Sequence, residues 1–149
     1  MLIIEEIDPG EAGPRALLEA SHKLMEELFP PEENHFLSIS ALQGPDIAFF
    51  HAREGELTLG TGALAARDGY GEVKSMFTAP EARCRGVGAA LLRQIEDKAR
   101  ALKLPALKLE TGDSLHAALA LYERHGFRPC GAFGGYRENA SSLFFEKVL

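Results

Sequence analysis

The sequence predicts a single α/β domain, in which helices cover both faces of a mixed, mostly antiparallel sheet of about six to seven strands. Three observations support this prediction. Between residues 46 and 78, strand-like segments follow one another directly, as they do in hairpins. From residue 71 onward, two strand-like segments are each followed by a helix-like one, an order that requires a parallel pair with a right-handed crossover. The length of 149 residues suits one domain that spans residues 1–149.

Composition and charge narrow the class of protein. Apolar residues make up 46% of the chain and charged residues 26%, which is ordinary for a globular domain. The net charge of −6 disfavours nucleic acid as a partner. No apolar run is long enough to cross a membrane, so we expect no membrane partner. The N-terminus MLIIEEIDPG does not resemble a signal peptide, and Cys84 and Cys130 form no disulfide framework. We therefore expect a cytoplasmic protein.

The N-terminal part of the chain predicts one strand and two helices. The apolar segment Leu2–Ile7 predicts a strand that ends at Asp8-Pro9-Gly10. From Ala12 to Phe29, apolar residues recur at near-helical spacing, and Pro30-Pro31 ends this helix. A second, short helix is expected around Phe36–Leu42.

The middle of the chain predicts three consecutive strands. DIAFFHARE and ELTLGTGALAAR flank a Glu54-Gly55 turn and predict a hairpin. Asp68-Gly69 gives a second turn before the strand Gly71–Thr78. These segments therefore predict the antiparallel part of the sheet.

Helices and strands alternate in the rest of the chain. The segment from Arg85 to about Leu102 carries one apolar stripe and predicts a long amphipathic helix. The strand ALKLET follows it, and a second helix, Leu115–His125, is closed by Gly126. A short strand at 127–130, a glycine-rich loop at 131–136 and a strand at 142–148 complete the prediction.

The junction between the strand Gly71–Thr78 and the long helix predicts an anion site. Two arginines and two glycines lie together there, at Arg83, Arg85, Gly86 and Gly88. The first turn of a helix has backbone N–H groups without partners, and glycines allow a ligand to approach them. The P-loop pattern is absent, and the dinucleotide fingerprint is unmet because alanines follow Gly86-Val87-Gly88. We therefore expect a phosphate group bound by a different kind of loop.

Two motifs give the chain a resemblance to a known family. Arg83, Gly86 and Gly88 match the GNAT signature of Gln or Arg, two residues, Gly, one residue, and Gly or Ala. Downstream, Tyr122, Gly126 and Phe127 match that family's second motif, a helix that ends in Tyr-x-x-x-Gly-Phe. From about Ile47 to its end, the chain therefore resembles the GNAT family of N-acetyltransferases.

The resemblance implies acetyl-CoA as co-substrate, bound where a central parallel strand pair splays apart beside a bulge. The main chain of Met76, Phe77 and Thr78 would bind the pantetheine arm. The pyrophosphate would bind at a loop made of Arg83, Cys84, Arg85, Gly86, Val87, Gly88 and Ala89. Many relatives have glycine where this chain has Cys84, so a positive φ there would strain the cysteine. The five histidines form no metal-binding pattern, and no metal is expected.

The resemblance also implies direct attack of an amine on the thioester. Tyr122 is the expected acid, because a protonated phenol can donate to the leaving thiolate; alternatively, it is only a core aromatic residue. Glu72 lies eleven residues before Arg83, where histone-acetylating relatives place a catalytic base. Alternatively, Glu72 is only a solvated carboxylate at the end of a strand. Glu110, His35 or an ordered water could then be the base.

The acceptor is expected to be a primary amine of a small molecule or, less readily, of a protein. His35, Glu110 and Tyr136 are the expected substrate residues, Tyr136 because a bacterial subgroup shares the Cys-x-x-Phe-x-x-Tyr stretch that begins at Cys130. Acidic residues before His35 could attract a cationic amine. The alternative function is a non-catalytic acyl-CoA-binding sensor or interaction module, and the strand 142–148 could pair in a homodimer.

Overall fold

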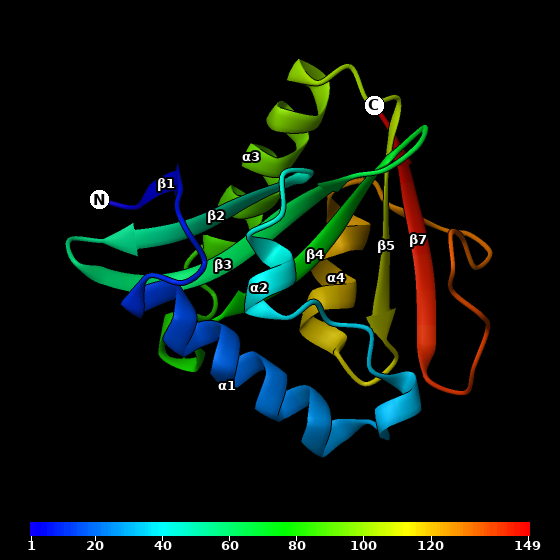
Figure 1. Ribbon diagram of the computed structural model, residues 1–149, viewed down its shortest axis with the longest axis horizontal. Helices are drawn as coiled ribbons and strands as arrows, with labels where there is room; N and C mark the ends of the chain where they lie inside the picture. Colours follow the sequence, from blue (N-terminus) through cyan, green and yellow to red (C-terminus); the bar gives the residue numbers. More distant parts are fainter.

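A computed structural model describes all of residues 1–149 and contains one seven-stranded sheet (Figure 1). The strand order is β1-β2-β3-β4-β5-β7-β6. Every neighbouring pair is antiparallel except β4 and β5, which are parallel. The strands are β1 (Ile3–Glu6), β2 (Ile47–Glu54), β3 (Leu57–Ala66), β4 (Gly71–Thr78), β5 (Ala106–Gly112), β6 (Arg128–Pro129) and β7 (Ser142–Val148). The mixed, mostly antiparallel sheet predicted from the sequence is thereby confirmed.

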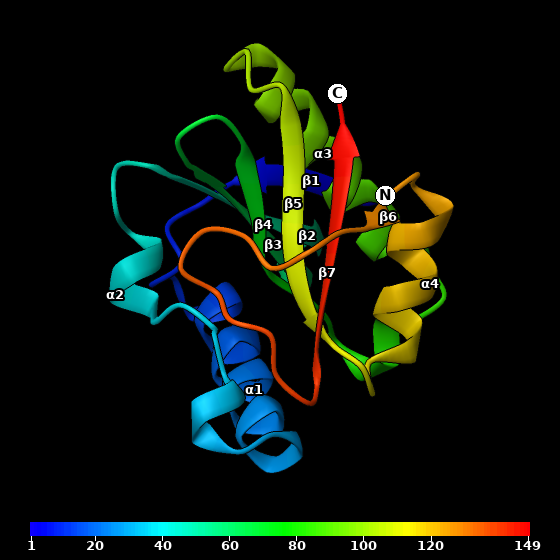
Figure 2. The ribbon, with the colours of Figure 1, turned by 90° about the vertical axis from the view of Figure 1, so that its right-hand side faces the viewer.

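Helices cover both faces of this sheet, as predicted. They are α1 (Ala12–Leu28), α2 (Ile39–Leu42), α3 (Val87–Ala101) and α4 (His116–Arg124), with 3₁₀ turns η1 (Pro31–Glu33) and η2 (Pro80–Ala82). Figure 2 shows α1 and α2 on one side of the sheet and α3 and α4 on the other. A core of 18 buried residues lies on the α3 side, and a smaller one of Leu18, Leu42, Phe49 and Ala63 lies under α1 and α2.

Local backbone chemistry explains where the observed elements differ from the predicted ones. Phe29 ends α1 in an extended conformation, because a residue before proline is pushed out of the helical region. The helix α3 begins at Val87 and not at Arg85, because Gly86 has a φ of +78°. The short helix shrinks to α2, which begins where the Ser38 hydroxyl accepts from the Ala41 N–H.

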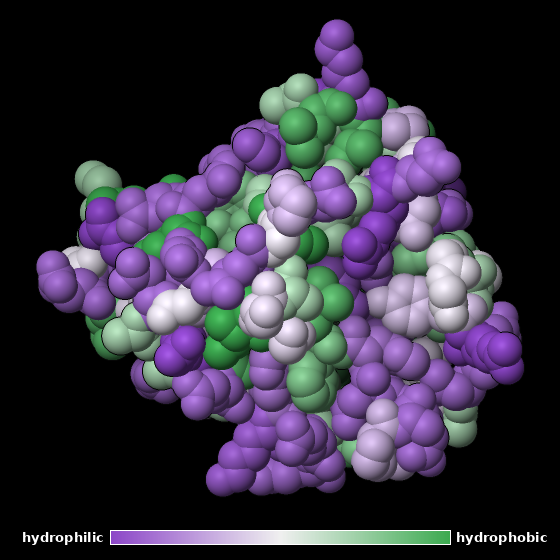
Figure 3. All heavy atoms as spheres, in the orientation of Figure 1, coloured by the Kyte–Doolittle hydropathy of each residue, from purple (hydrophilic) through white to green (hydrophobic).

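The helices have polar surfaces toward solvent, most visibly at the C-terminal end of α1. In Figure 3, hydrophilic residues cover the foot of the view, where the C-terminal end of α1 lies. Glu26 and Glu27 in the last turn of α1 and Glu32 in η1 have exposed side chains. None of the helices combines the length and the apolar character needed to cross a membrane.

The central strand pair opens immediately beside a bulge. β4 and β5 pair only at Gly71 with Leu107 and at Glu72 with Lys108, and then they part. Opposite this opening, the register between β3 and β4 shifts between Thr61 and Ala63, so that β4 contains one extra residue. Ser75 sits in the bulge with a φ of +56°. The predicted splayed pair is thus confirmed, and the edge of β4 that faces β5 is open from residue 73 to residue 78.

Candidate active site

The loop before α3 presents a row of free backbone donors. The N–H groups of residues 84 to 89 donate to no acceptor in the chain; the next one, of Ala90, already bonds to the carbonyl of Gly86. A Cβ at Gly86 would meet nothing within 4 Å, which leaves the approach to these donors open. At Gly88 a Cβ would lie 3.0 Å from the Leu121 side chain, so this glycine allows the helices α3 and α4 to pack closely. Free N–H groups at a helix N-terminus favour an anion.

Side chains of the same loop differ in how available they are. Arg83 forms no ion pair with the chain, whereas Arg85 Nη2 lies 2.7 Å from both carboxylate oxygens of Glu54. The Val87 side chain is buried in the core, so Val87 can offer a ligand only its main chain. Cys84 is exposed and has a φ of +63°. Cys84 therefore has the positive φ that strains a residue other than glycine, and this strain costs about 1 kcal/mol.

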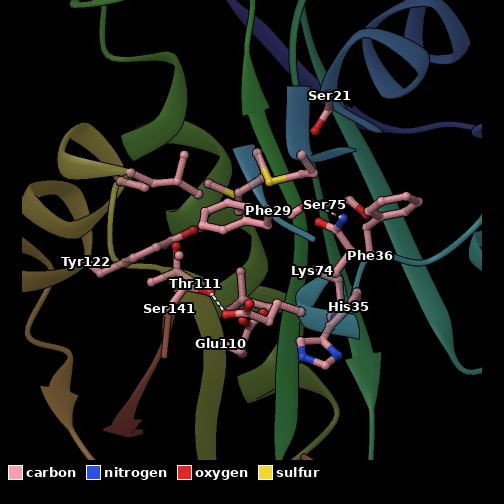
Figure 4. Close-up of a pocket in the computed structure, with 18 residues that line it drawn as sticks. Ser21, Phe29, His35, Phe36, Lys74, Ser75, Glu110, Thr111, Tyr122 and Ser141 are labelled. Atoms are coloured by element: carbon pink, nitrogen blue, oxygen red, sulfur yellow. Dashed lines mark hydrogen bonds between the residues drawn. The ribbon is translucent and has the colours of Figure 1, made fainter. Parts of the chain in front are cut away.

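A cleft opens where β4 and β5 part, and segments distant in sequence line it (Figure 4). One wall comes from α1 and the segment after it, with Phe29, His35 and Phe36. The others come from β4, β5, α4 and the residue before β7, and they include Lys74, Ser75, Met76, Glu110, Thr111, Tyr122 and Ser141. In Figure 4, Tyr122 lies on the opposite side of Phe29 from Ser75 and Phe36. Met76 thus connects the open edge of β4 to the cleft, while Phe77 and Thr78 continue that edge toward the loop.

Tyr122 belongs to the core and lines the cleft at the same time. The residue is only 5% exposed, and its ring packs against Phe127 with centroids 5.7 Å apart. Burial, reinforced by the Glu110 carboxylate, raises the pKa of the Tyr122 phenol well above its ordinary value. The phenol is therefore protonated at neutral pH and can act as a proton donor. The two interpretations offered by the sequence are compatible in the structure.

Two carboxylates, of Glu33 and Glu110, line the cleft. Glu110 accepts a hydrogen bond from the Ser142 hydroxyl at 2.7 Å through one oxygen, and its other oxygen has no partner in the chain. Glu33 accepts from the Ser141 hydroxyl. Both carboxylates line the cleft and give this part of it negative charge. A cationic amine would be attracted to it.

Two further polar atoms in the cleft walls have no partner. The Ser75 hydroxyl and His35 Nε2 are buried and form no hydrogen bond. Both residues line the cleft. Because buried polar groups in proteins are nearly always hydrogen-bonded, a bound molecule or water is the natural partner for them. His35, one of the predicted substrate residues, thus lines the cleft, whereas Ser75 gave no signal beyond its place in the strand.

Glu72 and Tyr136 lie outside the cleft wall, in a buried polar cluster. The Glu72 side chain is 3% exposed and accepts from Arg67 Nε at 3.1 Å and from the Tyr136 hydroxyl. Lys74 Nζ lies 3.6 Å from the same carboxylate. Glu72 is therefore neither the solvated strand-end carboxylate of the alternative interpretation nor a group open to the cleft. This arrangement favours Glu110 over Glu72 as the residue that can reach an acceptor.

Sequence reasoning missed Lys74 as a site residue. It lies in the middle of β4, lines the cleft and has only 7% of its side chain exposed. A lysine within VKSMFT, a segment otherwise suited to a central strand, was a signal for a buried charge with a dedicated partner.

An acyltransferase-type site on an α/β fold is defined by four features: the splayed strand pair, the bulge, the loop with free backbone N–H groups, and the tyrosine at the cleft. A family model described as Acetyltransferase (GNAT) family matches residues 15–127. The chain therefore belongs to the GNAT family of acetyltransferases, as its motifs predicted. No group of His, Cys, Asp and Glu side chains gathers in a way that could hold a metal ion.

Curated relatives and solved structures agree with this assignment. An IAA acetyltransferase of Azospirillum brasilense is 45% identical over 135 residues, which are 89% of this chain and 88% of the relative. The uncharacterised N-acetyltransferase YedL of Escherichia coli is 37% identical over 100% of this chain and 96% of its own length. A solved structure from Klebsiella pneumoniae has a TM-score of 0.84 and 32% identity, and the match covers 100% of this chain and 98% of that one.

One solved structure with acetyl-CoA bound has the same fold. A GNAT family acetyltransferase from Elizabethkingia anophelis, crystallised with acetyl-CoA, has a TM-score of 0.71 and 19% identity, with 99% of this chain and 98% of that chain covered. At this identity the similarity establishes the fold alone.

Proposed function

We propose that this acetyltransferase moves an acetyl group from acetyl-CoA to a primary amine of a small molecule by direct attack. One observation carries the proposal. The free N–H groups of residues 84 to 89 follow the open edge of β4, and Met76 on that edge lines the same cleft as Tyr122, so we take them together as one surface for the donor. A phosphate-bearing thioester fits this surface, with its anionic end at the loop and its acyl end at the cleft.

The chain's own residues fit such a donor. Arg83 and the N–H groups of the loop would hold the pyrophosphate, and the glycine at 86 leaves them accessible. The main chain of Met76, Phe77 and Thr78 would pair with the pantetheine arm, because β5 leaves this edge of β4 unpaired. An N–H group in the bulge near Ser75 would polarise the thioester carbonyl.

Residues of the cleft supply the proton transfers. An alkyl amine has a pKa of about 10.4 and must lose a proton before it can attack. Glu110 is suited to accept this proton, directly or through a water, because one of its oxygens is free in the cleft. Tyr122 would protonate the leaving thiolate. Glu33 and Glu110 would attract the cationic amine, and the unpaired Ser75 hydroxyl and His35 Nε2 would bind its polar groups.

The relatives support acetyl transfer in general, and the negative charge of the cleft is our reason for proposing an amine as the acceptor. IAA acetyltransferase is the name of a relative and does not by itself identify this chain's acceptor. A cytoplasmic location and a homodimer paired through β7 also stay predictions, which cell fractionation and light scattering can check.

The test combines a binding measurement with a turnover assay. Acetyl-CoA at a hundred times its dissociation constant should stabilise the fold by about 2.7 kcal/mol, seen as a thermal shift. A panel of small amines is then screened for thiol release from acetyl-CoA. Binding together with amine-dependent thiol release supports the proposal. Binding without release for any amine would favour the alternative of an acyl-CoA sensor, and the absence of any thermal shift would overturn the proposed donor.

A further inference from the structure

The ammonium group of Lys74 joins two loops that are distant in sequence. Lys74 Nζ donates to the carbonyl of His35, in the segment between α1 and α2, at 2.8 Å. It also donates to the Tyr136 hydroxyl, in the loop between β6 and β7, at 2.8 Å. The Tyr136 ring in turn meets the His35 ring edge-on at 5.1 Å. One buried cation therefore holds two separate segments against β4.

Glu72 provides the charge that this lysine needs. It lies two residues before Lys74 in β4, so both side chains point to the same face of the sheet. Its carboxylate lies 3.6 Å from Lys74 Nζ and accepts from the Tyr136 hydroxyl that Lys74 also contacts. Arg67, from the turn between β3 and β4, pairs with the other oxygen. Every member of this cluster has a partner, which makes the burial of its charges tolerable.

The contact with His35 bears directly on the cleft. Both Lys74 and His35 line the cleft, on the side opposite Tyr122. The bond from Lys74 is the only hydrogen bond between residues 29–38 and β4. The donor surface, by contrast, uses the later part of β4 and the loop before α3, which the cluster does not contact. Loss of the ammonium would therefore release the acceptor wall and leave the donor surface in place.

We propose that Lys74 is a positioning residue that fixes the His35 wall of the acceptor cleft, and that Glu72 is its buried counter-ion and not the proton acceptor. This inference rests on the proposed transfer to an amine for its kinetic consequences. It assigns to Glu72 a role different from the one that its place in the family motif suggests, because the neighbouring lysine and tyrosine occupy its carboxylate.

The charge of Lys74 should make acceptor binding sensitive to alkaline pH. Burial lowers the pKa of Lys74, and the carboxylates of Glu72 and Glu110 oppose this shift without cancelling it. The other groups near it are Arg67, which also lowers this pKa, the Tyr136 hydroxyl, and the His35 ring, which packs against Tyr136. Because the pKa is lowered, the ammonium loses its proton at a lower pH than an exposed lysine does. The wild-type KM for the acceptor should thus rise on the alkaline side earlier than the ionisation of an ordinary lysine would require.

The kinetic test compares Lys74→Met with Lys108→Met. Lys108 is on the neighbouring strand and packs over the Tyr70 and Phe133 rings at 5.4 and 5.6 Å, outside the cleft wall. Lys74→Met should raise the acceptor KM about tenfold, while kcat and the KM for acetyl-CoA change less than twofold. It should also flatten the alkaline rise in acceptor KM, and Lys108→Met should do neither.

Glu72→Gln supplies the decisive comparison. As a counter-ion variant it should raise the acceptor KM, and in combination with Lys74→Met it should add little, because the two residues act as a unit. If Glu72→Gln instead lowers kcat about a hundredfold at saturating acceptor with an unchanged acceptor KM, Glu72 is the base and the inference is overturned. If Lys74→Met does not fold, Tyr136→Phe takes its place in this comparison, because it deletes the hydroxyl that accepts from Lys74 Nζ.

Amide hydrogen exchange tests the positioning role without any turnover. Lys74→Met should accelerate exchange about tenfold in residues 29–38 and leave residues 84–101 unchanged, whereas Lys108→Met should leave both unchanged. Unchanged exchange in residues 29–38 would refute the positioning role. If this local change appears in a protein that acetylates no amine, the positioning role stands and the proposed function fails.

Discussion

The loop from Arg83 to Ala89 and the cleft around Tyr122 offer a ligand different kinds of atoms. The loop offers consecutive backbone N–H groups, made available by the backbone conformation at Gly86 and the start of α3. The cleft offers side chains from α1 and the segment after it, from β4, β5 and α4, and from the residue before β7, which meet only where β4 and β5 part. A run of main-chain N–H donors can be recognised in a short motif, whereas a group of side chains from segments far apart in the chain depends on the whole fold. This difference predicts that substitutions in the two regions separate donor binding from turnover.

The largest effect is expected in the cleft. Tyr122→Phe should lower kcat about a hundredfold, because it removes the proton donor for the leaving thiolate, and should leave the Kd for acetyl-CoA unchanged. Burial raises the pKa of the Tyr122 phenol, so wild-type turnover should show no loss of this acid at any pH below about 10. Steady-state kinetics over this pH range and a binding titration check both points. Tyr70→Phe, outside the cleft wall, is the control, and a Tyr122→Phe enzyme with normal kcat would assign Tyr122 to the core alone.

In the loop, a new negative charge should affect binding and little else. Gly86→Asp should weaken acetyl-CoA binding at least about tenfold, because its carboxylate would face the phosphates among the free N–H groups. Gly69→Asp is a matched control, since φ is +83° at Gly69 and +78° at Gly86 and both positions open onto empty space. Isothermal titration measures the difference. Equal binding by the two variants would remove the anion site from this loop.

A smaller effect, on stability, is expected at Cys84. Because its φ is +63°, Cys84→Gly should raise the free energy of unfolding by about 1 kcal/mol, or Tm by about 3 °C. Cys84→Ser keeps the strain and should match the wild type. Thermal melts without ligand compare the three proteins. Equal stability of all three would mean that the loop relaxes around the cysteine at no cost.

The smallest effect is expected at the rim of the loop. Glu54 pairs with Arg85 at 2.7 Å, and both side chains are more than a third exposed, so the pair is weak. Glu54→Gln should free Arg85 for the phosphates and tighten acetyl-CoA binding about twofold at low salt, with the gain disappearing as salt rises. Glu56→Gln, in the same turn but without an ion pair, controls for the loss of charge. A salt-independent gain, or the same gain in both variants, would show that Arg85 plays no part.

Several features could be read from local sequence because local chemistry fixes them. The order of strands and helices, the parallel pair and its crossover follow from hydrophobic spacing and from turn residues such as Asp68-Gly69. The boundary errors, at Phe29 and Arg85, arise from the backbone conformations of one or two residues, which periodicity does not reveal. The motif also singled out Tyr122, which lines the cleft, and Cys84, whose φ of +63° meets the condition under which a cysteine is strained.

The amino-acid sequence by itself thus determined the fold and the family, and it located the loop before α3 for which we propose donor binding, because each depends on residues close together in the chain. Only the tertiary structure decided which groups surround Glu72 and which carboxylate faces the cleft. Arg67, Lys74 and Tyr136 surround Glu72 from three segments, and residues 67 and 136 are far apart in sequence. A carboxylate that is already paired and buried differs chemically from one that is free in a cleft. The sequence contains both glutamates, but their burial and partners arise only when the strands come together.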